Sequence, residues 1–287
     1  MLRRVVVPVI ALGALAIFTA AALRPASPSP QQARPQAHPS TQDPSVLVTL
    51  ETLEKWETEL SNWGRWGDDD QLGALNLITA AKRVEAARLI ETGTVVSMAR
   101  KMTIETLGNP EQASANRPPV LVGSVRNVFD INTEGGYFWE RYEIEYHGSA
   151  VSHLDALCHV AYNGKVYNGF DFEDVASTED GCTRLGVINL QDGLVTRGVL
   201  LDMPGRAVRR QDIEAWEEHA GVTLGPGDAL LLRVGRWAHR AAQGPTREMA
   251  GWDASVIPFL AERDIALLGA DSVHEAPDSV PGLGFNP

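Results

Sequence analysis

The chain has 287 residues, of which 44% are hydrophobic and 22% are charged, and its formal net charge is −12. These values are ordinary for a soluble globular protein, and the acidity argues against nucleic acid as a partner. Two cysteines, Cys158 and Cys182, are too few for a disulfide-built scaffold of this size.

The first 24 residues have the pattern of an export segment. Arg3 and Arg4 precede an uncharged, mostly apolar run over residues 5–23, and Arg24 follows it. This run is long for a signal peptide and just long enough to span a bilayer, so cleavage and retention as a membrane anchor are both open, with cleavage preferred. Under either interpretation we expect the rest of the chain to be exported to the periplasm or the extracellular space.

Residues 25–45 form a proline-rich linker with no aromatic and almost no aliphatic residue. Such a segment buries too little surface to offset the entropy lost on ordering it. We therefore expect a single folded domain over residues 46–287.

Two amphipathic helices are expected at the start of this domain, over residues 49–62 and 79–90. Thr79 is the expected N-cap of the second helix, and Gly93 follows its end. Residues 63–70 between them are rich in glycine and acidic residues, which predicts a loop whose acids 68–70 are solvated.

The remaining chain alternates strand and helix patterns. Strands are expected over residues 94–99, 137–146, 199–201, 229–234 and 265–268, and helices over 210–220 and 256–263. The order predicts a single α/β domain, with α+β as the alternative.

The segment from Ser152 to His159 holds two imidazoles and a carboxylate. His153 and Asp155 are two residues apart, so on an extended segment they point to the same face and can reach one ion together. A straight strand would carry His159 about 20 Å away, so the chain must turn after Asp155 for His159 to join them. This donor set predicts a metal-dependent hydrolase.

With the motifs around this segment, the chain resembles the metal-dependent cyclase family, which includes bacterial kynurenine formamidases and isatin hydrolase. The resemblance spans residues 56–287 and implies mixed β-structure with flanking helices, commonly as a homodimer. The motifs that carry it lie at residues 66–79, 146–148, 163–165, 167–169, 181–182, 196–202 and 227–233.

The family motif is His-x-Gly-Thr-His-x-Asp-x-Pro-x-His. Its first two histidines and its aspartate bind metal, and its last histidine is an acid/base group or a second-metal ligand. The resemblance therefore implies that His153 and Asp155 are metal ligands and that His159 is the acid/base group.

This chain departs from the motif at four positions, and the loss of the first histidine to serine requires another metal ligand. His147, two residues earlier on the same strand face, is the expected replacement, and Ser149 acting through a water is the alternative. Asp271, His274 and Glu275 are further candidate donors. The four departures are Ser149, Val151, Ser152 and Leu157.

The expected reaction is hydrolysis of a C–N bond in a small amide, formamide or cyclic amide by metal-activated water. Mixed nitrogen and oxygen donors suit zinc or manganese. Trp66, in a loop bounded by glycines, is the expected wall of the substrate pocket. No Gly-x-Ser-x-Gly elbow supports a serine nucleophile instead.

Two questions stay open from the sequence. Export would allow Cys158 and Cys182 to pair, but Cys158 could also line the pocket or simply pack, and packing is the preferred interpretation. The alternative function is a catalytically impaired small-molecule or metal-binding protein on the same fold. It is favoured by Ser149 and by the end of the sequence at Pro287, because the resemblance implies a further C-terminal segment with another histidine and an acid.

Overall fold

The computed structural model describes residues 48–99, 130–131, 138–139, 152–205, 207–244, 250–272, 274, 276 and 279–280. The expected export segment, the linker and the start of the domain at residue 46 lie outside these residues, so the domain boundaries stay predictions. Within the described ranges, no helix has both the length and the apolar character needed to cross a membrane.

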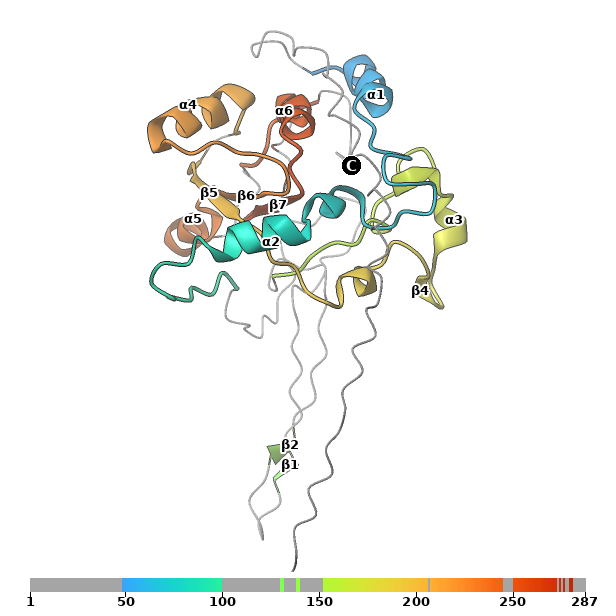
Figure 1. The fold of residues 1–287 in the computed structure, drawn as a ribbon, viewed down its shortest axis with the longest axis horizontal. Helices are drawn as coiled ribbons and strands as arrows, with labels where there is room; N and C mark the ends of the chain where they lie inside the picture. Colours follow the sequence, from blue (N-terminus) through green and yellow to red (C-terminus); the bar gives the residue numbers. More distant parts are fainter. Residues whose placement is uncertain are drawn as a thin grey trace, which may run out of the picture. The chain divides into compact units, whose positions relative to one another are not determined.

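A parallel three-stranded sheet forms the centre of the described fold (Figure 1). Its strands are β5 (Gly198–Asp202), β6 (Ala229–Arg233) and β7 (Leu267–Ala270), in the order β5-β6-β7. The first two confirm the predicted strands to within one residue at each end, and β7 is shifted two residues towards the C-terminus. Apolar runs of this kind suit parallel strands, which are covered by crossover helices.

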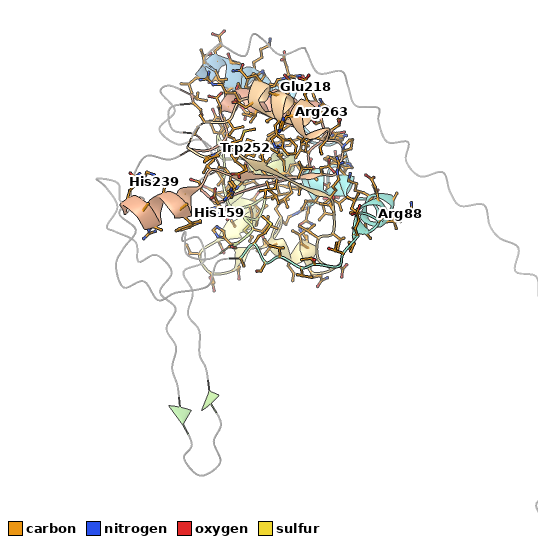
Figure 2. The ribbon with its side chains drawn as sticks, turned by 90° about the vertical axis from the view of Figure 1, so that its left-hand side faces the viewer. Arg88, His159, Glu218, His239, Trp252 and Arg263 are labelled. Carbon is orange, nitrogen blue, oxygen red and sulfur yellow. A yellow bond between two sulfur atoms is a disulfide. The ribbon has the colours of Figure 1, made fainter. Side chains whose placement is uncertain are left out.

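The helices α4 (Arg210–Ala220) and α6 (Ile257–Glu262) lie on the same side of this sheet (Figure 1). A short 3₁₀ turn, η4 (Ala254–Val256), precedes α6. Side chains fill the space between the helices and the sheet, as Figure 2 shows around the labelled Trp252. The largest fully buried members of this core are Leu201, Val208, Ile213, Leu224, Leu230, Leu232, Val256 and Phe259. Both predicted helices are confirmed.

Helix α5 (Arg236–Gln243) was not predicted. It begins directly after Gly235, whose φ of 76° breaks the strand direction, and none of its residues is buried. Trp237 is its one large apolar residue, so the repeated apolar spacing on which the other helices were predicted is missing.

Helix α2 (Ala80–Ala87) begins at its predicted cap, and α1 (Leu50–Glu59) begins at a similar cap that the sequence analysis did not name. In α1 the Thr49 hydroxyl accepts from the amide of Thr52 at 3.2 Å, and in α2 the Thr79 hydroxyl accepts from that of Lys82 at 3.1 Å. Helix α2 ends before residue 90, in a turn that begins at its C-cap. The predicted loop at 63–70 is confirmed, and a 3₁₀ helix, η1 (Gly73–Leu77), lies between it and α2.

The strand predicted over residues 94–99 is wrong. This segment pairs with none of the described strands, and Val95 and Val96 are 92% and 77% exposed. β-Branched residues favour a pleated, half-buried surface, so without a neighbouring strand their propensity alone does not form one. Of the strand predicted over 137–146, the described part is β2 (Phe138–Trp139), which pairs with β1 (Asp130–Ile131) in antiparallel fashion.

Short elements follow the His153–His159 segment in the chain. They are η2 (Tyr167–Gly169), α3 (Phe172–Val175), β3 (Ala176–Ser177), β4 (Gly181–Cys182) and η3 (Val187–Leu190). Strands β3 and β4 form a small antiparallel hairpin. The described elements are a mixture of helices and strands, which confirms the predicted α/β class.

Gly227 marks a point where η1 and α2 approach the start of β6. Its φ is +78°, and a Cβ there would lie 2.6 Å from the Leu77 carbonyl oxygen and 3.1 Å from Lys82 Cγ. Because left-handed backbone alone costs a non-glycine residue about 1–2 kcal/mol and the carbonyl must also move, we expect Gly227→Ala to lower the free energy of unfolding by at least about 2 kcal/mol.

Urea unfolding would measure this loss, with Gly225→Ala as the control. A Cβ at Gly225 meets no atom within 4 Å, and its φ lies outside the left-handed range. Equal losses in the two variants would contradict the interpretation.

Candidate functional site

His153 and Asp155 lie side by side, as their spacing predicts. Residues 152–156 carry no helix or strand, and His153 Nε2 is 3.5 Å from Asp155 Oδ1. The two side chains are 22% and 49% exposed, so both are open to solvent. A tetrahedral ion with bonds of about 2.0–2.2 Å holds two neighbouring donor atoms about 3.4 Å apart. The pair therefore fits two adjacent ligand positions of one metal ion.

His159 follows a turn, which the sequence required if it was to approach the pair. The amide of His159 donates to the Ala156 carbonyl oxygen at 2.9 Å, closing a four-residue turn directly after Asp155. The imidazole is exposed, and Figure 2 labels it. Its acid/base role stays a prediction.

The described residues bring two donors together but not three. No group of three or more His, Cys, Asp or Glu side chains suited to a metal ion occurs among them. The expected third ligand, His147, and its alternative, Ser149, lie outside the described residues. The third ligand therefore stays a prediction.

The further candidate donors near the C-terminus do not join the pair in the described structure. Both carboxylate oxygens of Asp271 accept from backbone amides at the end of β6, from Val234 at 2.7 Å and from Gly235 at 3.1 Å. His274 is exposed, and its carbonyl oxygen accepts from the Trp252 amide. Glu275 lies outside the described residues. Asp271 therefore holds the turn into α5.

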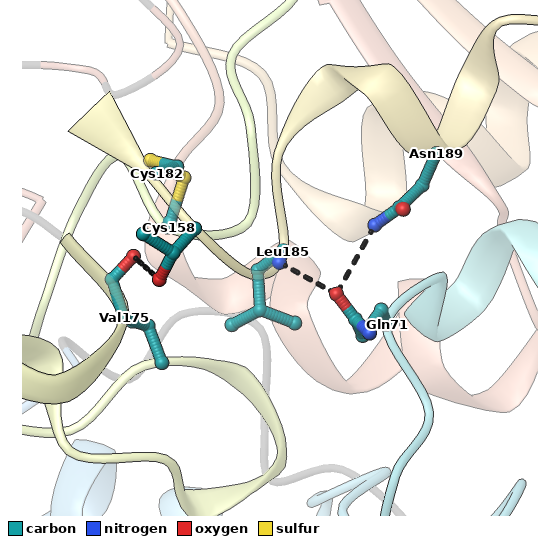
Figure 3. Close-up of a disulfide and its surroundings, with 7 residues drawn as sticks. Gln71, Cys158, Val175, Cys182, Leu185 and Asn189 are labelled. Carbon is teal, nitrogen blue, oxygen red and sulfur yellow. Dashed lines mark hydrogen bonds between the residues drawn. A yellow bond between two sulfur atoms is a disulfide. The ribbon is translucent and has the colours of Figure 1, made fainter. Parts of the chain in front are cut away.

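Cys158 and Cys182 form a disulfide, so the preferred interpretation of simple packing is wrong. Their Cα atoms are 6.3 Å apart, and Cys158 is 1% exposed, in a buried cluster with Val166, Val175 and Leu185. Figure 3 shows the bond joining the residue before His159 to strand β4. Cys158 is buried, as that interpretation expected, but its sulfur is bonded to Cys182.

Trp66 is partly buried and packs against a small cluster of Leu77, Ile78 and Ala266. The guanidinium carbon of Arg65 lies 4.7 Å from the centre of its ring. This cation–π contact fixes the ring within the loop 63–70. Its predicted role as a pocket wall stays a prediction.

Asp70 organises this loop, a role that the sequence analysis missed. Its Oδ2 accepts from the Tyr167 hydroxyl at 2.9 Å and from the Gly73 amide at 2.8 Å, while its Oδ1 accepts from Asn76 Nδ2 at 2.7 Å. Burial, and then the bond to Asp70, raise the pKa of Tyr167 well above its ordinary value, so its hydroxyl stays a donor at neutral pH. Of the three acids expected to be solvated, residues 68 and 69 are exposed and Asp70 is not.

Asn168 completes the attachment between the loop and the η2 turn. Its Oδ1 accepts from the Gly64 amide at 2.7 Å, and its Nδ2 donates to the carbonyl oxygens of Gly67 at 3.0 Å and Asp68 at 2.9 Å. The signal in the sequence is the Tyr-Asn-Gly turn, in which Asn168 adopts a positive φ of 64°. This attachment places the loop that carries Trp66 against the segment that follows the His153–His159 motif.

Comparisons with known proteins agree on one family. The family model Cyclase matches residues 96–275. A crystal structure described as that of "a novel cyclase" is 27% identical in sequence, covers 75% of this chain and 79% of its own, and superimposes with a TM-score of 0.62. A search of curated proteins found no match.

Proposed function

The chain belongs to the Cyclase family, and on that premise we propose that it is an exported, metal-dependent hydrolase that cleaves the C–N bond of a small amide, formamide or cyclic amide. Membership supports a hydrolase-like enzyme of the cyclase fold. The single observation that carries the finer proposal is the 3.5 Å separation of His153 Nε2 and Asp155 Oδ1, which suits two ligands of one ion.

The proposed site consists of His153, Asp155 and His147 as ligands, with His159 beside them. When bound, a zinc or manganese ion would supply Lewis acidity that lowers the pKa of a water molecule and polarises the substrate carbonyl. His159 takes the proton from the attacking water and delivers it to the leaving nitrogen as the C–N bond breaks. Trp66 is proposed to form one wall of the substrate pocket.

Export is supported by two features. The apolar run over residues 5–23 is preceded by Arg3 and Arg4, and the disulfide between Cys158 and Cys182 is of a kind that persists in oxidising compartments. We therefore propose a periplasmic or extracellular location, with residues 5–23 either cleaved or kept as a membrane anchor. A homodimer is proposed on the family resemblance.

The first test of the proposal is metal content. The purified full-length chain would be dialysed against a weak chelator and analysed by mass spectrometry, then assayed on a panel of formanilides, N-formyl amino acids and cyclic imides. We expect close to one zinc or manganese per chain, with turnover that chelation removes and added metal restores. Absence of both metal and turnover would contradict the proposal and favour the small-molecule-binding alternative.

His159→Ala separates chemistry from metal binding. We expect it to keep its metal but to lower kcat by about 10²–10⁴-fold, because positioned acid/base groups contribute rate enhancements of that size. The matched control is His219→Ala, an exposed histidine in the last turn of α4, which should leave kcat unchanged. Normal turnover by His159→Ala would remove the acid/base role.

A further inference from the structure

We propose that the turn formed by Asn163 and Gly164 is a site of spontaneous covalent modification, at which the asparagine is converted to isoaspartate and aspartate. The triplet Tyr-Asn-Gly occurs at residues 162–164 and again at 167–169. The fold leaves the first copy open to this reaction and protects the second. The proposal does not depend on the proposed hydrolase activity, because its outcome is read from the mass of the chain.

The reaction joins an asparagine side chain to the backbone nitrogen of the next residue. That nitrogen attacks the side-chain Cγ, the C–N bond of the amide breaks, and ammonia leaves with the proton that the backbone nitrogen loses. Water then opens the resulting cyclic imide at one of its two carbonyl carbons, which gives isoaspartate or aspartate without any oxidation or reduction. A following glycine favours ring closure because it has no Cβ to hinder the attack.

Asn163 and Gly164 are the two central residues of an exposed hairpin turn. The residues on either side, Tyr162 and Lys165, exchange two backbone hydrogen bonds of 2.9 Å. The φ angles are 50° at Asn163 and 74° at Gly164, and two positive angles in succession are typical of a type I′ turn. Both central residues are exposed to solvent, so water reaches the atoms that react.

Both reacting groups of this first pair are available. In the part of the chain that the structure describes, neither the Asn163 side chain nor the Gly164 amide has a hydrogen-bond partner. Outside the neighbouring residues, no described atom lies within 4 Å of the place that a Cβ on Gly164 would take. Opening the turn for ring closure therefore breaks only exposed backbone hydrogen bonds, which solvent replaces.

Both reacting groups of the second pair are held. Hydrogen bonds of 2.7, 3.0 and 2.9 Å join the side-chain amide of Asn168 to backbone groups of the loop 63–70. The Gly169 amide, which would have to attack, donates to the Val166 carbonyl oxygen at 3.1 Å. The ring of Trp63 also lies 3.4 Å from the place that a Cβ on Gly169 would take, so this side of the turn is covered.

The fold therefore separates two triplets that are identical in sequence. Before Asn168 reacts, its side chain must lose three hydrogen bonds, and three bonds of ordinary net strength correspond to at least about tenfold in rate. We expect deamidation of the folded chain at Asn163 to be faster than at Asn168 by at least this factor.

The test is peptide mapping of the folded full-length chain after incubation at mildly alkaline pH, where the attacking nitrogen loses its proton more readily. The chain is then unfolded, its disulfide is reduced and alkylated, and trypsin cleaves after Lys165. This cleavage places Asn163 and Asn168 in different peptides. Mass spectrometry of each peptide measures the replacement of the side-chain NH₂ by OH, and equal rates at the two asparagines would overturn the proposal.

The same chain unfolded in guanidinium chloride is the control. Without the fold, the two Tyr-Asn-Gly triplets should react at similar rates. If the unfolded chain kept the preference for Asn163, the sequence rather than the fold would set the rates, and the proposal would be overturned. It would also be overturned if the folded chain showed no reaction at Asn163 over the time in which the unfolded chain reacts at both triplets.

A second measurement identifies the product in the turn. Isoaspartate adds one carbon to the backbone, which a two-residue turn does not accommodate without losing its hydrogen bonds. Hydrogen exchange at the Lys165 amide, which donates to the Tyr162 carbonyl oxygen, should therefore be faster in the modified chain. The matched control is Asn163→Asp, which keeps the length of the backbone and should keep slow exchange. Equally slow exchange in the modified chain would contradict the formation of isoaspartate.

Discussion

Asp155→Asn is expected to lose the bound metal and to reduce amide hydrolysis by at least about 10⁴-fold. The carboxylate is the only charged donor of the proposed ligand set, and asparagine keeps its shape without its charge. A metal ion contributes several kcal/mol to the stabilisation of the transition state, and about 1.36 kcal/mol corresponds to tenfold in rate. Since metal retention and rate depend on the same carboxylate, both should fall together.

Mass spectrometry of the dialysed protein and kcat/KM on the best amide substrate would measure the two effects. The matched control is Asp192→Asn, an exposed aspartate in the loop between η3 and β5, which should keep its metal and its rate. If Asp155→Asn retained near-stoichiometric metal, the His153–Asp155 pair would not be the metal site.

The central sheet and its helices could be predicted from the sequence because their signals are local. Strands β5 and β6 are apolar runs whatever their partners, and α4 combines one buried face with Gly221, whose φ of 64° ends the helix. The strand expected at 94–99 is wrong for the opposite reason. β-Branched residues indicate that a segment suits a sheet, but not that a neighbouring strand is present to pair with it.

The candidate site also contains features that the sequence predicts and features that it does not. His153 and Asp155 are two residues apart, and the sequence predicts from this spacing that they approach each other, as they do. The disulfide joins residues 24 apart, and the Tyr167 hydroxyl reaches Asp70 across 97 residues. No periodic pattern encodes pairs at such separations, so the disulfide and the attachment of the loop became visible only in the folded chain.

Asp228→Ala is expected to cost the fold about 3–5 kcal/mol, the usual loss when one partner of a buried ion pair is removed. Asp228 is fully buried, and its carboxylate accepts from Arg197 Nε at 3.0 Å, from Lys82 Nζ at 2.7 Å and from the Gly225 amide at 2.8 Å. Without the carboxylate, the ion-pair partner left to the 9%-exposed Lys82 among the described residues is Glu85, at 3.6 Å. Urea unfolding would measure the loss.

The control is Asp202→Ala. Asp202 pairs with Arg233, but the two side chains are 50% and 57% exposed, so solvent screens the pair and a much smaller loss is expected. Similar losses of stability in the two variants would show that burial does not make the contacts of Asp228 more stabilising than the exposed pair of Asp202 and Arg233.

The pH dependence of stability gives an independent check on Asp228. Burial alone would raise the pKa of this carboxyl, but hydrogen bonds from Arg197 and Lys82 outweigh it and hold the pKa below its ordinary value. A carboxyl with a depressed pKa in the folded state stabilises the fold above its unfolded pKa of about 3.9, and this stabilisation is lost as the pH falls through the folded pKa. The wild-type chain should therefore lose stability more steeply below about pH 4 than Asp228→Ala does. Parallel acid-unfolding curves would mean that the charge of Asp228 does not stabilise the fold.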